Sequence, residues 1–350
     1  MFPTRSRLVL CCALFVVFAL SVAACGGGGD DAAATDATTR TEPVTTTTAA
    51  PIIAPLTGLV DPTGVSMTRP AMTVKIDNTR PALPQWGVDQ ADVVYEEVVE
   101  GQITRLALMF QSQAPGKIGP IRSVRNTDQA IVWPVGGIFV YSGGAQISIR
   151  SISEAPVHLI DEEAAGDTMF RDRSLRAPFN LYGIGEKLFA EGGEPVPPPP
   201  IFQFRAAGAS AVGEPATSFN VGFRGTNPSN AVNWTWNPAS GSYTRNVFGA
   251  DLMTGTGAPI APQNVVVQFV NYVGGEGRGG AGAEGSEAEM LGTGEAWVFT
   301  GGVVIKGSWR RDSKEAPTRF VDSAGAPIAL APGQTWVELP QIGYAVTVTP

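Results

Sequence analysis

Cysteine and histidine are almost absent from this 350-residue chain. Its three cysteines, Cys11, Cys12 and Cys25, all lie near the N-terminus. The sequence after residue 25 therefore cannot form a disulfide, use a thiolate nucleophile or hold zinc through sulfur. The single histidine, His158, excludes a multi-histidine metal site and catalysis by a pair of histidines. We expect no metal site, and the sequence implies no cofactor.

Charged residues are also scarce, at 16% of the chain, and acids outnumber bases by 32 to 24. A net charge of -8 gives no support to nucleic-acid binding and favours a soluble exterior. The 43% hydrophobic content, with 42 glycines and 28 prolines, is typical of a loop-rich, strand-rich globular protein with some unstructured segments. A chain of this length can bury a large core and is expected to hold two domains.

The N-terminal 25 residues read as a targeting segment. Arg5 and Arg7 precede an apolar run over residues 8–20 that is too short to span a membrane stably. The run closes on small residues and then Cys25, a pattern that resembles a bacterial lipobox. The resemblance implies that residues 1–24 are a lipoprotein signal peptide and that Cys25 carries lipid. Several acyl chains would then anchor the protein to the outer face of the cell membrane, in an extracytoplasmic location. The alternative is an ordinary secretory signal with a coincidental cysteine.

The rest of the chain predicts an α+β fold behind a tether. Residues 25–54 are rich in Gly, Thr and Ala and cannot support a core, so we expect a flexible tether of roughly 30 Å. A mixed α/β first domain is expected over residues 55–206 and a β-rich second domain over residues 207–350. Expected helices cover residues 126–133, 145–152 and 185–191. Expected strands include residues 72–76, 138–142, 219–223, 232–236, 242–247 and 265–273, with a loop over 274–289 and a hairpin over 297–305 that turns at Gly301-Gly302.

The sequence features with the most chemical content gather in residues 91–125. Two apolar runs, over residues 93–98 and 103–110, predict half-buried strands, and Glu100-Gly101 is the only turn signal between them. A two-residue loop at that point would place an opposite-charge pair between two apolar pairs on one face. The predicted pairs are Val98 with Ile103, Glu96 with Arg105, and Val94 with Ala107.

Two features after this hairpin point to an anion. Arg122 and Arg125 are three residues apart, a spacing that on a helix places both guanidinium groups on one side. Farther on, a strand runs into Gly143-Gly144 and then a helical pattern, which leaves free backbone N–H groups at a helix start. Packing or turn geometry is the alternative explanation for the two glycines.

We therefore predict a polar site for an anionic ligand. Arginine forks suit carboxylates and phosphates, which wall peptides and teichoic-type polymers carry. Residues 171–176 add a second basic cluster, whose alternative role is to pair with the acids at 161–163. The candidate residues are Glu96, Glu100, Arg105, Arg122, Ser123, Arg125, Gly143, Gly144, Arg171 and Asn180.

Short stretches from residue 56 to the end carry a resemblance to a known family. They are RPAMTVKIDN (69–78), PQWG (84–87), ADVVYEEVVEGQITRLALMFQS (91–112), KIGPIRSVRN (117–126), VYSGG (140–144), FRD (170–172), APFN (177–180), SGSYTR (240–245), NVVV (264–267), KGSWRRDS (306–313) and PTRFVDSAGAPIALAPGQTWVEL (317–339). In their order and density the chain resembles the YerB-like lipoproteins of Gram-positive bacteria, which have an N-terminal and a C-terminal domain of unknown function. The resemblance implies a lipid-anchored extracytoplasmic protein and no particular activity.

The chain departs from the family pattern at three places where relatives often have histidine. These are Phe179, Tyr141 (aromatic or histidine in relatives) and the segment 249–255. A mechanism that depends on histidine would therefore be lost in this chain, which lowers the expectation of an enzyme.

Three functions remain open from the sequence. The first is an envelope binding module that recognises a cell-wall component or an envelope protein through the arginines. The second is a wall-polymer hydrolase or transferase that uses paired carboxylates, Asp92 with Glu96 or Glu96 with Glu100, although no catalytic motif accompanies them. The third is a structural lipoprotein in which the charges form a salt-bridge network and a protein partner binds elsewhere.

Overall fold

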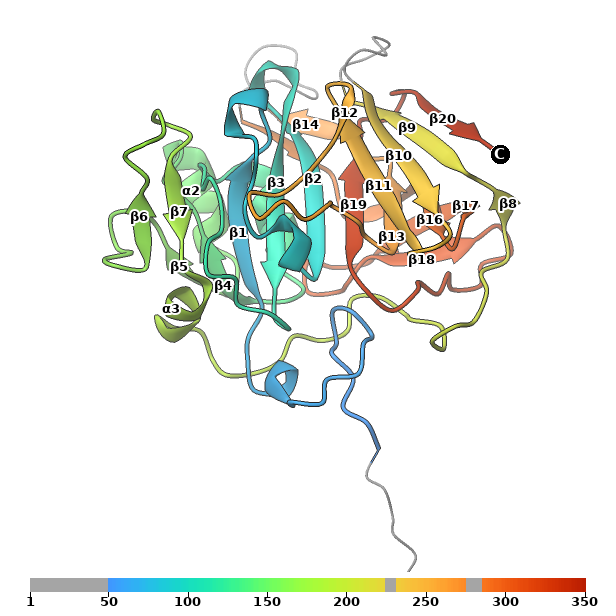
Figure 1. Ribbon diagram of the computed structural model, residues 1–350, viewed down its shortest axis with the longest axis horizontal. Helices are drawn as coiled ribbons and strands as arrows, with labels where there is room; N and C mark the ends of the chain where they lie inside the picture. The colour runs from blue at the N-terminus through green and yellow to red at the C-terminus, as the bar shows by residue number, and fades with distance from the viewer. Residues whose placement is uncertain (1–49, 224–230, 275–284) are drawn as a thin grey trace, which may run out of the picture. The chain divides into compact units, whose positions relative to one another are not determined.

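A mixed sheet of eleven strands carries the fold (Figure 1). The computed structural model describes residues 50–223, 231–274 and 285–350, which cluster into one unit. The path of the sheet runs β18 (Arg319–Asp322), β17 (Val303–Arg311), β16 (Gly292–Thr300), β13 (Asn264–Gln268), β19 (Thr335–Leu339), β2 (Val93–Val99), β3 (Ile103–Phe110), β1 (Met72–Asp77), β4 (Gly137–Val140) and β5 (Val157–Ile160), and β8 (Glu214–Pro215) pairs with β17 outside this path.

A second, five-stranded sheet covers part of the first one. Its order is β12 (Ala250–Asp251), β11 (Ser242–Val247), β10 (Ala231–Asn237), β9 (Ser218–Gly222) and β20 (Val346–Thr349). Two further pairs of short strands are β14 (Tyr272–Gly274) with β15 (Ser286–Ala288), and β6 (Met169–Arg171) with β7 (Leu181–Gly183). Figure 1 shows the second sheet on the side of β16 and β17, and α2 and α3 on the side of β4 to β7.

Helices are few and short in the described residues. The α-helices are α1 (Asn126–Val132), α2 (Gln146–Ser153) and α3 (Gly185–Ala190), and the 3-10 turns are η1 (Val65–Met67), η2 (Arg80–Ala82), η3 (Val88–Gln90) and η4 (Glu100–Gln102). None of these helices has the length and the apolar composition that a membrane-crossing helix needs. The predicted α+β class is confirmed, with a mixed α/β sheet in the first part and a β-rich second sheet.

The predicted hairpin at Gly301-Gly302 is also confirmed. Thr300 pairs with Val303, so the loop contains only the two glycines. Their φ angles are 64° and 79°. A type I′ turn needs positive φ at both central residues, which glycine adopts at little cost.

The predicted register of the central hairpin is wrong by one residue. The loop between β2 and β3 has three residues, so Val99 pairs with Ile103 and Glu97, rather than Glu96, pairs with Arg105. Gly101 and Gln102 both have positive φ, of 72° and 60°. Gln102 gives no turn signal in the sequence, because glutamine rarely takes this conformation. A shift of one residue moves every side chain of a strand to the other face.

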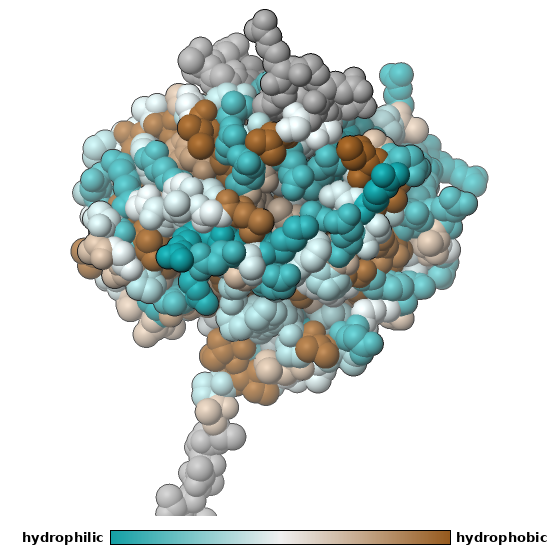
Figure 2. Space-filling model, turned by 180° about the vertical axis from the view of Figure 1, so that it is seen from behind, coloured by the Kyte–Doolittle hydropathy of each residue, from teal (hydrophilic) through white to brown (hydrophobic). Residues whose placement is uncertain are grey.

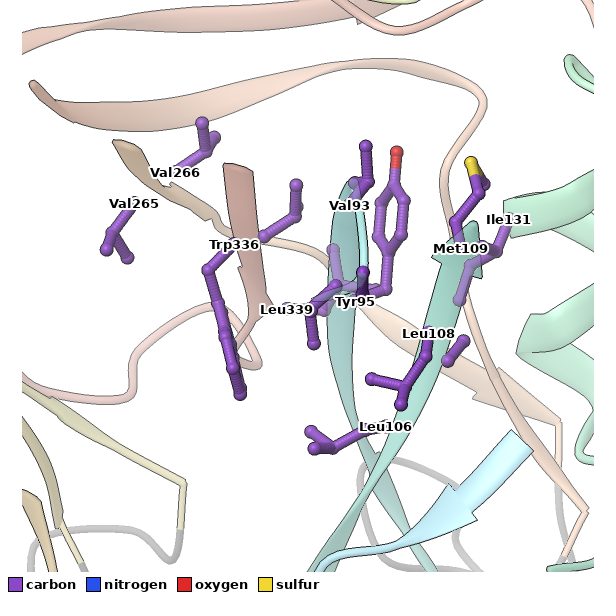
Figure 3. Close-up of a cluster of buried hydrophobic side chains, with 14 of the residues drawn as sticks. Val93, Tyr95, Leu106, Leu108, Met109, Ile131, Val265, Val266, Trp336 and Leu339 are labelled. Carbon is purple, nitrogen blue, oxygen red and sulfur yellow. The ribbon is translucent and has the colours of Figure 1, made fainter. Parts of the chain in front are cut away.

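The prediction that these strands are half-buried is also wrong. All seven residues of β2 are buried, because both faces of the central strands are covered. One face, here called the helix face, carries Val93, Tyr95 and Met109 and lies towards Ile131 of α1 (Figure 3). The opposite face carries Leu106, Leu108 and Trp336 (Figure 3), and Trp336 packs against Trp234 of the second sheet with ring centroids 5.3 Å apart.

The single strand expected over residues 265–273 is divided in two. β13 ends at Gln268, and Val270 then donates its N–H to the carbonyl of Pro340, which draws the chain away from the sheet. Tyr272 starts β14 and pairs with Ala288, so the expected loop over 274–289 contains strand β15. Residues 275–284 of that loop, the predicted signal peptide and residues 25–49 of the expected tether lie outside the described residues.

The large sheet includes strands from both expected domains. β19, from the second part of the chain, lies parallel to β2 from the first part, and Thr335 pairs with Val93. The two parts therefore share one sheet and one core. The boundary near residue 206 stays a prediction.

Candidate functional site

Three arginines from two segments meet on the helix face of the large sheet. Arg105 lies on β3, and Arg122 and Arg125 lie in the extended segment that leads into α1. The carboxylates that neutralise them come from Asp77, at the end of β1, and Glu100, in the hairpin loop. We call these five residues the arginine cluster.

The contacts inside the arginine cluster are short. The Nε of Arg122 donates to Asp77 Oδ2 at 2.7 Å. Arg125 donates to both carboxylate oxygens of Glu100, from Nε at 2.6 Å and from Nη2. Arg105 Nη2 lies 3.6 Å from the same carboxylate. The cluster therefore contains three positive charges and two negative charges.

The predicted reason for the convergence of Arg122 and Arg125 is wrong. Neither residue lies inside a helix, because α1 begins at Asn126 and Arg125 is its N-cap. The two arginines are instead held by separate carboxylates, Arg122 by Asp77 and Arg125 by Glu100. The main-chain carbonyl of Ser123 accepts hydrogen bonds from Arg105 at 3.1 Å and from Arg125 at 3.2 Å.

Electrostatic effects follow from this crowding. Burial, and then repulsion from Arg125, lowers the pKa of Arg105 to about 10, and Arg122 adds to the decrease. Burial alone would raise the pKa of Glu100, but the hydrogen bond and charge of Arg125, helped by Arg105, lower it to about 2. The side chains of Arg105, Arg125 and Arg122 are 4%, 16% and 21% exposed, so Arg122 is the most accessible of the three.

A group of fully buried charges lies next to the arginine cluster and contacts Arg125. Lys75 on β1 contacts the carboxylates of Glu97 and Asp128, and all three side chains are fully buried. The other oxygen of Asp128 accepts the main-chain N–H of Arg125 at 2.7 Å. Burial raises the pKa of Glu97, against the opposing effect of Lys75. Lys75 and Asp128 therefore fix the start of α1 and the position of Arg125.

Gly143 and Gly144 lie next to the arginine segment, as the prediction of a common site requires. Gly143 accepts a hydrogen bond from the N–H of Val124, and Ser142 donates one to the carbonyl of Arg122, each at 3.0 Å. A Cβ on Gly144 would lie 2.7 Å from Val124, so this close approach needs glycine. No side chain caps the start of α2, and within the described residues the amides of Gly144, Gln146 and Ile147 find no acceptor.

The other candidate residues lie elsewhere. Glu96 points to the opposite face of the sheet, where its carboxylate accepts from Arg245 at 2.6 Å. Arg171 forms a two-bond ion pair with Glu162 and donates to Asn180 at 2.8 Å, which agrees with the alternative role considered for the second basic cluster. Within the described part of the chain, neither Arg171 nor Asn180 makes a hydrogen bond or ion pair with the three arginines.

Glu96 belongs to a buried polar group that the sequence did not indicate. Arg245 is fully buried, and its guanidinium lies 4.7 Å from the ring centroid of Trp336 and 5.7 Å from that of Trp234. Burial, and then the charge of Glu96, raises the pKa of Glu338 well above its ordinary value, which favours its neutral form. Glu96 and Arg245 also line a cavity of about 220 Å³ between the two sheets.

Acidification is expected to release Arg125 from Glu100 as the pH falls through about 2, the pKa of Glu100 in the folded protein. The pKa of Glu100 in the folded protein, about 2, is below the ordinary value of 4.5. The stabilising contribution is therefore complete above pH 4.5 and is lost as the pH falls towards 2. Since Glu100 is 39% exposed, screening keeps this contribution small, and a local signal such as the Arg125 Nε resonance is the suitable measurement. In Glu100→Gln this resonance should not change over the same range, and an unchanging wild-type resonance would contradict the assignment.

Comparisons with known proteins cover both parts of the chain. The N-terminal domain model of "Protein of unknown function (DUF3048)" matches residues 56–194, and its C-terminal domain model matches residues 221–337. The chain is 29% identical over 307 residues to "Putative lipoprotein YerB" of Bacillus subtilis (strain 168), which covers 82% of this chain and 85% of that protein. A crystal structure of YerB protein from Bacillus subtilis has the same fold, with a TM-score of 0.72 and 24% identity, over 85% of this chain and 99% of that chain.

Proposed function

The chain belongs to the family defined by the DUF3048 N-terminal and C-terminal domains, and from its own geometry we propose a lipid-anchored extracytoplasmic protein that binds an anionic group at the arginine cluster. The anchor rests on the lipobox-like sequence before Cys25 and on a relative named as a lipoprotein. The ligand is a phosphate or carboxylate group of an envelope component.

The observation that carries the binding proposal is the state of Arg122. Its Nε is held by the buried carboxylate of Asp77, and this is the only hydrogen bond that its guanidinium makes in the described part of the chain. The two Nη groups remain on a partly exposed side chain with their donors unused. Two parallel N–H donors held in place in this way match the oxygens of a carboxylate or phosphate.

The charge balance around Arg122 supports the same ligand. Three guanidinium groups lie together with two carboxylates, so one positive charge is not neutralised within the cluster. An anion beside Arg122 would relieve the repulsion that lowers the pKa of Arg105. The neighbouring amides at the start of α2 add donors of the same polarity.

A groove beside the cluster gives room for the rest of the ligand. The Arg122 guanidinium lies 5.6 Å from the ring centroid of Phe179, which lines a groove of about 640 Å³. Lys117 lines it too, with its ammonium 4.0 Å from the ring centroid of Tyr182 and 4.6 Å from that of Trp86. An extended molecule could place an anionic group at Arg122 and continue over these rings towards Lys117.

The geometry does not favour the hydrolase alternative. A general acid or base must reach its substrate, but the Glu96 carboxylate is buried and occupied by Arg245, Asn78 and Thr104. The carboxylate of Asp92 likewise accepts hydrogen bonds from Ser112 and from the amide of Gln111. Both carboxylates are therefore engaged by groups of the protein itself.

The binding proposal predicts that Arg122→Lys weakens binding by about ten- to hundredfold, the effect of one or two hydrogen bonds to a charged group. Lysine keeps a positive charge next to Asp77 but lacks the two parallel N–H donors of the guanidinium group. Isothermal titration of the mature protein with inorganic phosphate, teichoic-acid fragments and muropeptides would measure the change and separate phosphate from carboxylate ligands.

The matched control is Arg150→Lys on the exposed surface of α2, which should bind like the wild type. The melting temperature of Arg122→Lys should stay close to that of the wild type, because the contact with Asp77 is kept. Equal binding by both variants, or a wild-type protein that binds none of the three ligands, would leave the cluster with a structural role only.

A further inference from the structure

An apolar groove of about 930 Å³ lies beside the place where the described chain begins. Figure 2 shows hydrophobic residues gathered at this end of the molecule. Large aliphatic side chains and prolines line the groove. Ile52 and Val196 are the sequence neighbours of two lining residues, and they are 42% and 62% exposed. We call the exposed lining the basal apolar patch: Ile53 (46% exposed), Leu59 (48%), Val60 (59%) and Met67 (46%), with Pro197, Pro198 and Pro200.

The loop that presents the patch is held by its own contacts. Ile53 forms a β-bridge with Val60, so the two side chains are fixed near the entry of the chain. The carboxylate of Asp61 accepts the N–H groups of Thr63, Gly64 and Ser66, at 2.9, 3.0 and 2.8 Å. The aliphatic side chains are therefore exposed by an ordered loop.

The groove contains little charge. Arg205 is the one charged residue among those that line the groove in the described part of the chain. Its Nε donates to the carbonyl of Ala209 and its Nη1 to Thr300, each at 2.8 Å. A surface of this composition favours a partner that is apolar over a wide area.

The segment between Cys25 and the described residues has little apolar surface with which to cover the patch. Residues 26–49 connect Cys25 to the first described residue, and Pro43 and Val44 are their only apolar side chains larger than alanine. Twenty-four residues can reach at most about 85 Å, the length of a fully extended chain. The patch thus lies within reach of any membrane that holds Cys25.

We propose that the basal apolar patch docks on the lipid bilayer that anchors Cys25. This inference rests on the proposed lipid anchor and is independent of the ligand at the arginine cluster. Leu59, Val60 and Ile53 would enter the boundary between headgroups and acyl chains, to a depth of about 5–10 Å. The folded unit would then lie on the membrane in a fixed orientation, instead of standing away from it on a free tether.

Spin labels on the mature lipoprotein in nanodiscs test this orientation. With Cys25 lipidated, a cysteine introduced at Leu59 or Val60 is the only free thiol. Ile147 and Ile342 provide matched controls, since they are 61% and 60% exposed and do not line the groove. Collision of each nitroxide with oxygen, which concentrates in lipid, is compared with collision with a water-soluble nickel chelate.

We expect the nitroxides at Leu59 and Val60 to collide mainly with oxygen, and those at Ile147 and Ile342 to collide mainly with the nickel chelate. Adding Ile53→Asp and Met67→Asp should abolish the oxygen preference at Val60. If the protein stays anchored but every nitroxide collides mainly with the nickel chelate, the docking inference is overturned and the lipid anchor stands. Labels at the patch that are shielded from both reagents would also overturn it, because a protein surface would then cover the patch. A protein that leaves the nanodiscs would overturn the lipid anchor and this inference together, while the titrations at the arginine cluster would still stand.

Discussion

Replacing Lys75 with methionine is expected to lower the free energy of unfolding by about 3–5 kcal/mol, the cost of removing one partner from a buried ion pair. The side chains of Lys75, Glu97 and Asp128 are all fully buried. Without the ammonium group, two carboxylates would remain next to each other in the core. Urea unfolding followed by tryptophan fluorescence would measure the loss.

The control for this experiment is Arg150→Met, which removes an exposed cation and should change the unfolding free energy by no more than about 0.5 kcal/mol. Lys75→Met should also weaken anion binding, since Asp128 would no longer be held where it accepts the N–H of Arg125. A Lys75→Met protein as stable as the control would show that the buried charges are readily accommodated without the lysine.

Arg245→Met is expected to cost a similar amount, about 3–5 kcal/mol. Arg245 joins the two sheets, because it lies on β11 and donates to Glu96 on β2 at 2.6 Å, with both side chains buried. Its guanidinium also lies over the ring of Trp336. The variant would leave the carboxylate of Glu96 in the core without its charged partner, although Asn78 and Thr104 still donate to it.

A double-mutant cycle separates the ion pair from the packing around it. Glu96→Gln alone strands the charge of Arg245, but Arg245→Met with Glu96→Gln removes both charges, so the double variant should be more stable than the sum of the single effects predicts. Lys306→Met is the matched control, because Lys306 lies over Trp297 and pairs with Glu214 on the surface. Its effect should stay within about 1 kcal/mol. Additive effects in the cycle would exclude the coupling of Arg245 with Glu96.

The regular elements were largely predictable, for local reasons. The alternation over residues 72–76 predicted β1, and the paired glycines at 301–302 predicted a tight turn, since both signals depend on neighbouring residues. The sequence also predicted that Glu100, Arg105, Arg122 and Arg125 belong to one polar site. Their arrangement was not predicted, because Arg122 is positioned by Asp77 and Arg125 by Glu100, instead of by helical spacing.

The hairpin register marks the limit of this reasoning. Gln102 takes a positive φ that its residue type disfavours, and the extra loop residue places Glu97, in place of Glu96, opposite Arg105. Because adjacent residues of a strand point to opposite faces, Glu96 lies on the other face of the sheet. Two adjacent glutamates thereby enter two separate buried networks, with Arg245 and with Lys75. Neither partner lies near them in the sequence, so no local pattern could assign the pairs.

The sequence by itself determined the α+β class, most of the strands and helices, the prediction of a lipid anchor and the family. These properties depend on composition, periodicity and short motifs, which the chain carries locally. Only the tertiary structure decided that both parts share one sheet, that Asp77 and Glu100 hold the arginines, and that an apolar patch lies beside the first described residues. Each of these depends on which distant side chains are brought into contact, and a register shift of a single residue is enough to exchange those partners.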